Sequence, residues 1–136
     1  MTSHACVQAA FREGFSPVAI LLKLEAVVVA GAALAAYYYL GLSWWIFAAL
    51  ILAPDLSAVG YIGGARLGAW TYNLTHTYVA PFILGVIGYM AHQPLLLAYA
   101  AIWFTHIGGD RLLGYGLKFP GDPKDNHLTR LSSRPT

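Results

Sequence analysis

Four long apolar stretches occupy most of this chain and constrain its fold more than any other feature. Each holds about 20 mostly apolar residues, the length that an α-helix needs to cross the hydrocarbon core of a bilayer. Backbone polar groups find no water in that core, so a single apolar stretch crosses it as a helix. The stretches cover residues 17–40, 43–62, 67–90 and 94–116.

The composition agrees with a membrane protein and leaves little room for a soluble module. Hydrophobic residues make up 58% of the 136 residues and charged residues only 10%, against about 25% charged in an ordinary soluble domain. The sequence predicts an all-α integral membrane protein, a four-helix up-down bundle with short loops. Its expected parts are a polar leader over 1–16, a four-helix domain over 17–118 and a tail over 119–136.

A secretory signal peptide is the competing interpretation of the first apolar stretch. Signal peptides have a basic start and a short, uninterrupted apolar core. In this chain Arg12 is followed by Glu13, and Lys23 and Glu25 interrupt the apolar run. We therefore expect residues 17–40 to form a membrane span.

The basic residues predict the orientation of the spans. With an even number of spans both ends of the chain share a side, and the turns near Gly41 and residues 91–93, on the other side, carry no Lys or Arg. Positive residues near span ends favour the cytoplasm, so both termini should be cytoplasmic. The net charge of +2 reflects this bias and does not indicate nucleic-acid binding. The basic residues on the shared side are Arg12, Arg66, Arg111, Lys118, Lys124, Arg130 and Arg134.

Six polar residues interrupt the apolar stretches, and counting from the cytoplasmic ends at 1.5 Å per residue places them at similar depth. Each ionisable group in a membrane costs about 2.5–3.5 kcal/mol even on lenient scales, so these side chains should face one another or water. Four different spans then contribute to one buried polar layer. Its members are Glu25, Asp55, Asn73, His76, His106 and Asp110.

A divalent metal site is the first chemistry that fits this layer. Imidazoles of His76 and His106 with carboxylates of Asp55 and Asp110 form a mixed nitrogen and oxygen set suited to zinc, iron or manganese. Thiolate clusters are excluded because Cys6 is the only cysteine. Such a metal could activate water to hydrolyse a lipid or small amphiphile. We assign the catalytic roles to Glu25, as base, and Arg111, near an anionic group.

Three alternatives remain open at this point. In a proton-coupled small-molecule transporter Glu25 would bind protons, and such a protein would need to be a homodimer because four short helices enclose little space. Haem could be held between His76 and His106. The polar layer could also be a network that only fixes helix packing. In each case the tail could fold over the cytoplasmic mouth of the bundle and bring His127 there.

Five strings of the sequence resemble an uncharacterised family of small bacterial membrane proteins, catalogued as domain of unknown function 4260. They are LLKLEAV at 21–27, APDLSAVGY at 53–61, YNLTHTYVAP at 72–81, WFTHIGGDRLLGYGLKFP at 103–120 and DNHLTR at 125–130.

The resemblance covers about residues 20–131 and implies a multi-pass protein of the bacterial inner membrane, with no activity attached. The recurring polar positions of the family include the six residues of the layer and Arg111. The family pattern also includes further polar positions that could support the site or form a lid over it. A fainter likeness is to membrane-bound metal-dependent hydrolases, whose paired-histidine motif this chain lacks. The supporting or lid positions are Tyr72, Asn73, Tyr115, Lys118 and His127.

Overall fold

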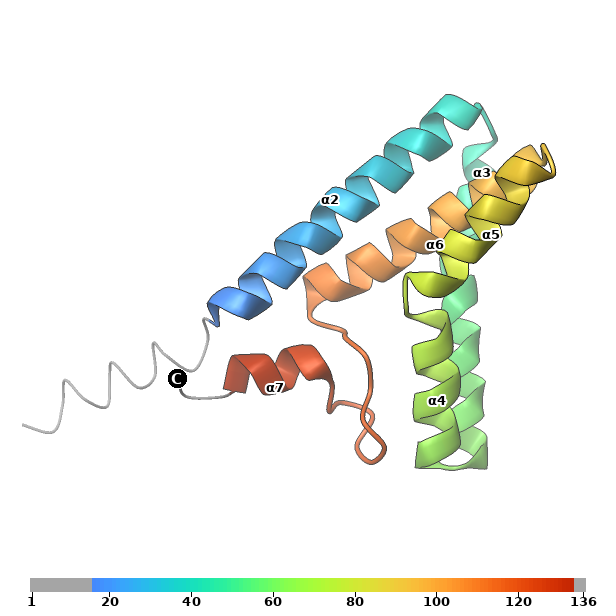
Figure 1. Cartoon of the computed structure of the whole chain (residues 1–136). Helices are drawn as coiled ribbons and strands as arrows, with labels where there is room; N and C mark the ends of the chain where they lie inside the picture. Colours follow the sequence, from blue (N-terminus) through green and yellow to red (C-terminus); the bar gives the residue numbers. More distant parts are fainter. Residues whose placement is uncertain (1–15, 134–136) are drawn as a thin grey trace, which may run out of the picture.

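The computed structural model describes residues 16–133, which form helices joined by short turns (Figure 1). The all-α fold class predicted from the sequence is confirmed for this part of the chain. The leader predicted over 1–16 lies outside the described residues except for Ser16. The elements are α2 (Pro17–Leu40), α3 (Trp44–Leu50), the 3₁₀ helix η1 (Ala53–Gly63), α4 (Ala65–Thr75), α5 (Val79–Met90), α6 (Pro94–Leu113) and α7 (His127–Ser133).

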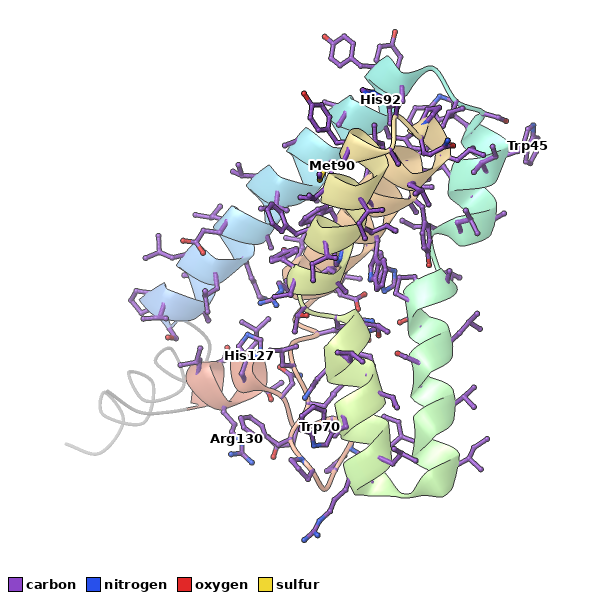
Figure 2. The ribbon with its side chains drawn as sticks, turned by 45° about the vertical axis from the view of Figure 1, so that its right-hand side comes forward. Trp45, Trp70, Met90, His92, His127 and Arg130 are labelled. Atoms are coloured by element: carbon purple, nitrogen blue, oxygen red, sulfur yellow. The ribbon has the colours of Figure 1, made fainter. Side chains whose placement is uncertain are left out.

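Two helical stretches of the described chain are long and apolar enough to cross a membrane, namely Pro17–Leu40 and Trp44–Gly63. Only 17% and 6% of their most apolar windows are buried inside the structure, whereas the core helix of a soluble protein is mostly buried. Large side chains project outward from them. Trp45, for example, is 85% exposed, and Figure 2 shows its side chain pointing away from the other helices. An apolar surface of this extent is typical of contact with lipid or with another protein.

The second and third apolar stretches are not continuous α-helices, as the sequence analysis had assumed. α3 ends at Leu50, and the chain continues through a turn into η1, which contains Pro54. The third stretch is divided into α4 and α5, and Pro81 lies in the first turn of α5. A proline cannot donate a backbone hydrogen bond, and its ring clashes with the carbonyl group four residues earlier. Each break therefore has a proline as its local cause.

α2 and α6 lie against each other over their length, with small residues between them. A Cβ atom built at Gly108 would lie 2.6 Å from the carbonyl oxygen of Ala26 and 2.7 Å from Cβ of Ala30. Glycine and alanine at such positions let two helices approach closely in lipid. This contact fixes the C-terminal half of α6, which carries part of the candidate site.

The direction of the chain alternates from α2 through α3 and η1, then α4 and α5, to α6 (Figure 1). The main packing contacts, however, form two groups: α2 and α5 pack on α6, while α4 packs on η1. Figure 1 shows the pair of α4 and η1 extending away from the other group. The predicted four-helix bundle around one common core is therefore not confirmed.

We expect Gly108→Ala to lower the free energy of unfolding by about 1–3 kcal/mol, because the added methyl group overpacks the contact with α2. Gly109→Ala is the matched control, since a Cβ atom there meets nothing within 4 Å. That control should be neutral or stabilising by up to about 1 kcal/mol, because alanine favours the helix. Denaturant unfolding of both variants in detergent measures the difference, and equal stabilities would contradict the close packing.

Candidate metal centre

Two histidines and two aspartates converge where η1 begins, where α4 ends and where the last turns of α6 pass. Both imidazole rings are buried. The side chain of Asp110 is 19% exposed and that of Asp55 is 46% exposed, so the cluster opens on the Asp55 side. Each residue offers one ligand atom, and these atoms all lie within 4.8 Å of one another. The four residues are Asp55, His76, His106 and Asp110.

The distances between the ligand atoms fall in a narrow range. The two Nε2 atoms of His76 and His106 are 3.2 Å apart, and the four distances from these atoms to the aspartate oxygens lie between 3.3 and 3.6 Å. A tetrahedral site with metal–ligand bonds of about 2.1 Å has edges of about 3.4 Å. Five of the six edges of the cluster therefore match a tetrahedral coordination shell, and the sixth, between the two carboxylate oxygens, is within 4.8 Å.

The environment of His76 determines which of its nitrogens faces the cluster as an acceptor. Its Nδ1 atom lies 2.9 Å from the carbonyl oxygen of Tyr72. A carbonyl oxygen can only accept, so this bond places the imidazole hydrogen on Nδ1. Nε2 then presents its lone pair to the aspartates and His106. Metal-bound histidines use their second nitrogen in this way, to donate to a carbonyl or carboxylate group.

Tyr72 supports the centre on a second side. Its ring stacks on the imidazole of His76 with centroids 3.7 Å apart, and its hydroxyl group donates to Oδ2 of Asp110 over 3.3 Å. Tyr72 thus contacts ligands from two different helices. The sequence analysis placed it beside the site, and the structure shows these contacts.

The centre is also supported by Thr75, at the end of α4, and by Trp103, on α6. The sequence analysis did not identify these two residues. Oγ1 of Thr75 lies 2.9 Å from Nδ1 of His76 and 2.7 Å from Oγ of Ser57 on η1. Nε1 of Trp103 on α6 donates to the carbonyl oxygen of Thr75 over 2.6 Å. This bond pairs a carbonyl group at the end of α4, where the helix supplies no partner. In the sequence, the only feature that pointed to either residue was the position of Thr75 directly before His76, a candidate ligand.

Glu25 and Arg111, predicted as catalytic, lie outside the cluster of four. Glu25 is exposed on α2 and lines an apolar cavity of about 580 Å³ together with Tyr78 and Arg111. The guanidinium group of Arg111 lies 4.9 Å from the centre of the Tyr78 ring. Within the described residues, Nε of Arg111 and the hydroxyl group of Tyr78 are buried without a hydrogen-bond partner. The cavity therefore combines an apolar wall with unused polar groups.

The tail folds back against the end of α4. The side chain of Asn73 donates to the carbonyl oxygen of Lys118 over 2.8 Å and accepts from its backbone N–H group over 2.7 Å. The ammonium group of Lys118 lies 5.0 Å from the Tyr72 ring and 5.6 Å from the ring of Tyr115, which is exposed. These residues, predicted as supporting or lid positions, thus link the tail to α4.

His127 lies at the start of α7 and holds the tail closed without reaching the four ligands. Its Nδ1 atom accepts from the backbone N–H group of Leu117 over 2.8 Å. The side-chain oxygen of Asn126 accepts from the backbone N–H groups of Leu128 and Thr129, which caps the first turn of α7. His127 therefore fixes the fold of the tail, and α7 starts from it (Figure 2).

Acid should release this tail contact. Burial, and then the positive charge of Arg111, hold the pKa of His127 below its ordinary value of 6.5. His127 therefore binds a proton more readily when the tail is released than when it is folded. The contact is fully stable above about pH 6.5 and is lost as the pH falls from there toward the lowered pKa. We expect the amide resonance of Leu117 to report this transition in an NMR titration.

His127→Gln should remove the transition, because glutamine carries no titratable group. His92→Gln is the control, since His92 lies in the turn between α5 and α6, at the far end of the molecule from α7 (Figure 2). A Leu117 resonance that moves equally in both variants would contradict the role of His127.

A family model described as Domain of unknown function (DUF4260) matches residues 19–131 of the chain. The matched region includes all four residues of the cluster and the tail as far as the first turns of α7. No curated protein matches the chain, and no solved structure matches it. Nothing in these comparisons supports the fainter likeness to membrane-bound hydrolases.

Proposed function

The chain belongs to this family of unknown function, and we propose from the geometry of its polar cluster that it is a membrane protein that binds one divalent metal ion. The ligands are Asp55, His76, His106 and Asp110. The observation that carries the proposal is the set of five ligand-to-ligand distances between 3.2 and 3.6 Å. Zinc, iron and manganese accept such a mixed set of imidazole and carboxylate ligands.

Electrostatics supports a cation at this place. With the hydrogen of His76 on Nδ1, the Nε2 lone pair of this ring faces two carboxylate oxygens. Acceptors this close repel one another unless a proton or a metal ion lies between them. His106 can supply one hydrogen from its Nε2 atom, but a single N–H group cannot satisfy three facing acceptors well. A divalent ion at the middle of the cluster satisfies all four.

We further propose that the metal supports hydrolysis of a lipid or small amphiphile. A divalent ion acts as a Lewis acid and makes a bound water more acidic. Four protein ligands fill a tetrahedral zinc shell, so catalysis requires a fifth position or a metal of higher coordination number, such as manganese or iron. The exposed side of Asp55 is where water and substrate can reach the cluster.

The cavity on α2 supports an amphiphilic substrate. Its wall consists mostly of leucine, valine and alanine side chains of α2, and its polar groups come from Glu25, Tyr78 and Arg111. Tyr78 follows the ligand His76 by two residues, and Arg111 is the neighbour of the ligand Asp110. We propose that an acyl chain lies on the apolar wall with its polar end at these groups, Glu25 acting as base and Arg111 binding an anionic group.

The proposed setting is the bacterial inner membrane, crossed several times with both termini in the cytoplasm. The two apolar helices and their exposed side chains support contact with lipid. The tail, with Lys118, Lys124 and Arg130, lies at one end of the molecule, and the turns at Gly41 and residues 91–93, without basic residues, lie at the other (Figure 1). Basic ends favour the cytoplasm.

The decisive measurement is the metal content of the protein, purified without chelators, by mass spectrometry. We expect about one equivalent of a divalent transition metal per chain, as for a site with four protein ligands. His106→Ala and Asp110→Asn should each lose it, because each removes a ligand. His92→Ala is the control and should retain it. Wild-type protein that contains no metal and binds none when zinc, manganese or iron(II) is supplied would overturn the proposal.

A proton-coupled transporter is the second candidate, favoured by one observation: Glu25 is an exposed carboxyl group in an apolar helix and lines a cavity. Such a transporter would work as a homodimer, with this cavity at the contact between two chains.

Glu25→Gln separates the two candidates. In a hydrolase it should leave metal content intact and lower kcat for a fluorogenic acyl ester by about 100-fold or more, as expected when a general base is lost. In a transporter it should abolish proton flux into vesicles that hold a pH-sensitive dye. Wild-type protein with bound metal but no ester hydrolysis above background would contradict the hydrolytic proposal.

A further inference from the structure

All three lysines of the chain line one cavity. The sequence contains Lys23, Lys118 and Lys124 and no other lysine. The cavity has a volume of about 550 Å³ and lies between the first turns of α2, the end of α6, the tail and α7. Two segments that are distant in sequence thus contribute these side chains: α2 provides Lys23, and the tail provides Lys118 and Lys124.

These ammonium groups have no carboxylate partner. None of the salt bridges within the described residues involves a lysine. The two nearest acidic side chains of the tail are engaged elsewhere: Asp125 pairs with Arg130, and Oδ1 of Asp122 accepts from the backbone N–H group of Lys124. No acidic residue is among the described residues that line the cavity. Asp110 and Asp122 act on Lys118 through their charge without forming a salt bridge, and three positive charges at a concave surface attract an anion.

Two hydroxyl groups that line the cavity are already engaged, which leaves the ammonium groups as donors for a ligand, although that of Lys118 also lies over the rings of Tyr72 and Tyr115. The hydroxyl group of Thr129 donates to the carbonyl oxygen of Asn126 over 2.8 Å, and that of Ser132 donates to the carbonyl oxygen of Leu128 over 3.0 Å. Each ammonium group carries three donors. The end of α6 adds a partial negative charge equivalent to about half an elementary charge, which three ammonium groups outweigh.

We propose that this cavity binds a phosphate group. A phosphate monoester carries close to two negative charges near neutral pH and presents several acceptor oxygens, which matches a cavity lined by three lysine side chains. Lysine binds phosphate as a point charge and does not need the planar geometry of a carboxylate pair. The volume also leaves room for the group to which the phosphate is attached.

The phosphate could belong to a lipid headgroup or to a soluble molecule, and the chemistry that recognises it is the same. The cavity adjoins both sources when the tail faces the cytoplasm, because it is lined by the first turns of α2 and the last residue of α6 rather than by residues midway along these helices. The inference does not depend on the metal centre, because none of its four ligands lines this cavity.

The test measures binding of inorganic phosphate by calorimetry, with the full chain in nanodiscs of phosphatidylcholine. In parallel, native mass spectrometry measures whether phosphatidic acid is retained in preference to phosphatidylcholine. Saturable binding of inorganic phosphate indicates a soluble ligand. Selective retention of phosphatidic acid without binding of inorganic phosphate indicates a lipid headgroup. Absence of both results overturns the proposal and leaves the metal proposal standing, because neither measurement needs a metal.

Two sets of variants assign the binding to the cavity. Lys23→Gln and Lys124→Gln should each weaken binding by about tenfold, the usual effect of one lost hydrogen bond to a charged group. The corresponding arginine variants should retain it, which guards against simple misfolding. Arg66→Gln is the matched control, because it removes the same charge at an exposed position outside the cavity. Binding that survives Lys23→Gln and Lys124→Gln together also overturns the proposal.

Discussion

The convergence of four ligand atoms, two imidazole nitrogens and two carboxylate oxygens, is the constraint on which the rest of the structure depends. Two carboxylates and two imidazoles lie within a few ångströms in an otherwise apolar molecule. Carboxylates placed this close repel each other strongly where water is scarce. Three elements hold them together: the start of η1, the end of α4 and the C-terminal half of α6. A helix break lies beside the ligand of η1 and beside the ligand at the end of α4, and the close contact with α2 lies beside the ligands of α6.

Helix breaks are costly in a membrane, and the side chains around the centre reduce that cost. A helix broken within lipid leaves carbonyl and N–H groups unpaired, which is tolerated only where protein or water satisfies them. The carbonyl group of Thr75, at the break after α4, accepts from Trp103. The carbonyl group of Pro54, in the first turn of η1, accepts from the hydroxyl group of Ser57. Side chains close to the ligands thus also pair backbone carbonyl groups at both breaks.

The sequence was sufficient to predict the four clustered residues because charged groups in apolar stretches are rare and their depth can be counted. Counting gives depth along a helix but not the direction around it. Glu25 was therefore placed in the layer, whereas the structure puts it on the outer face of α2, beside the other cavity. Thr75 and Trp103 could not be found, since their bonds exist only because a helix ends where the apolar pattern continues. The pairing of α4 with η1 depends on the same breaks.

The reciprocal pair of hydrogen bonds between Asn73 and the backbone of Lys118 has a consequence for biosynthesis. The two residues are separated by 45 positions, so α4 leaves the ribosome long before its partner exists. The amide of Asn73, together with Asp55 and His76, must wait for α6 and the residues after it. The cluster is thus completed only after α6 has been synthesised, and a chain arrested before α6 would hold Asp55 and His76 without His106 and Asp110.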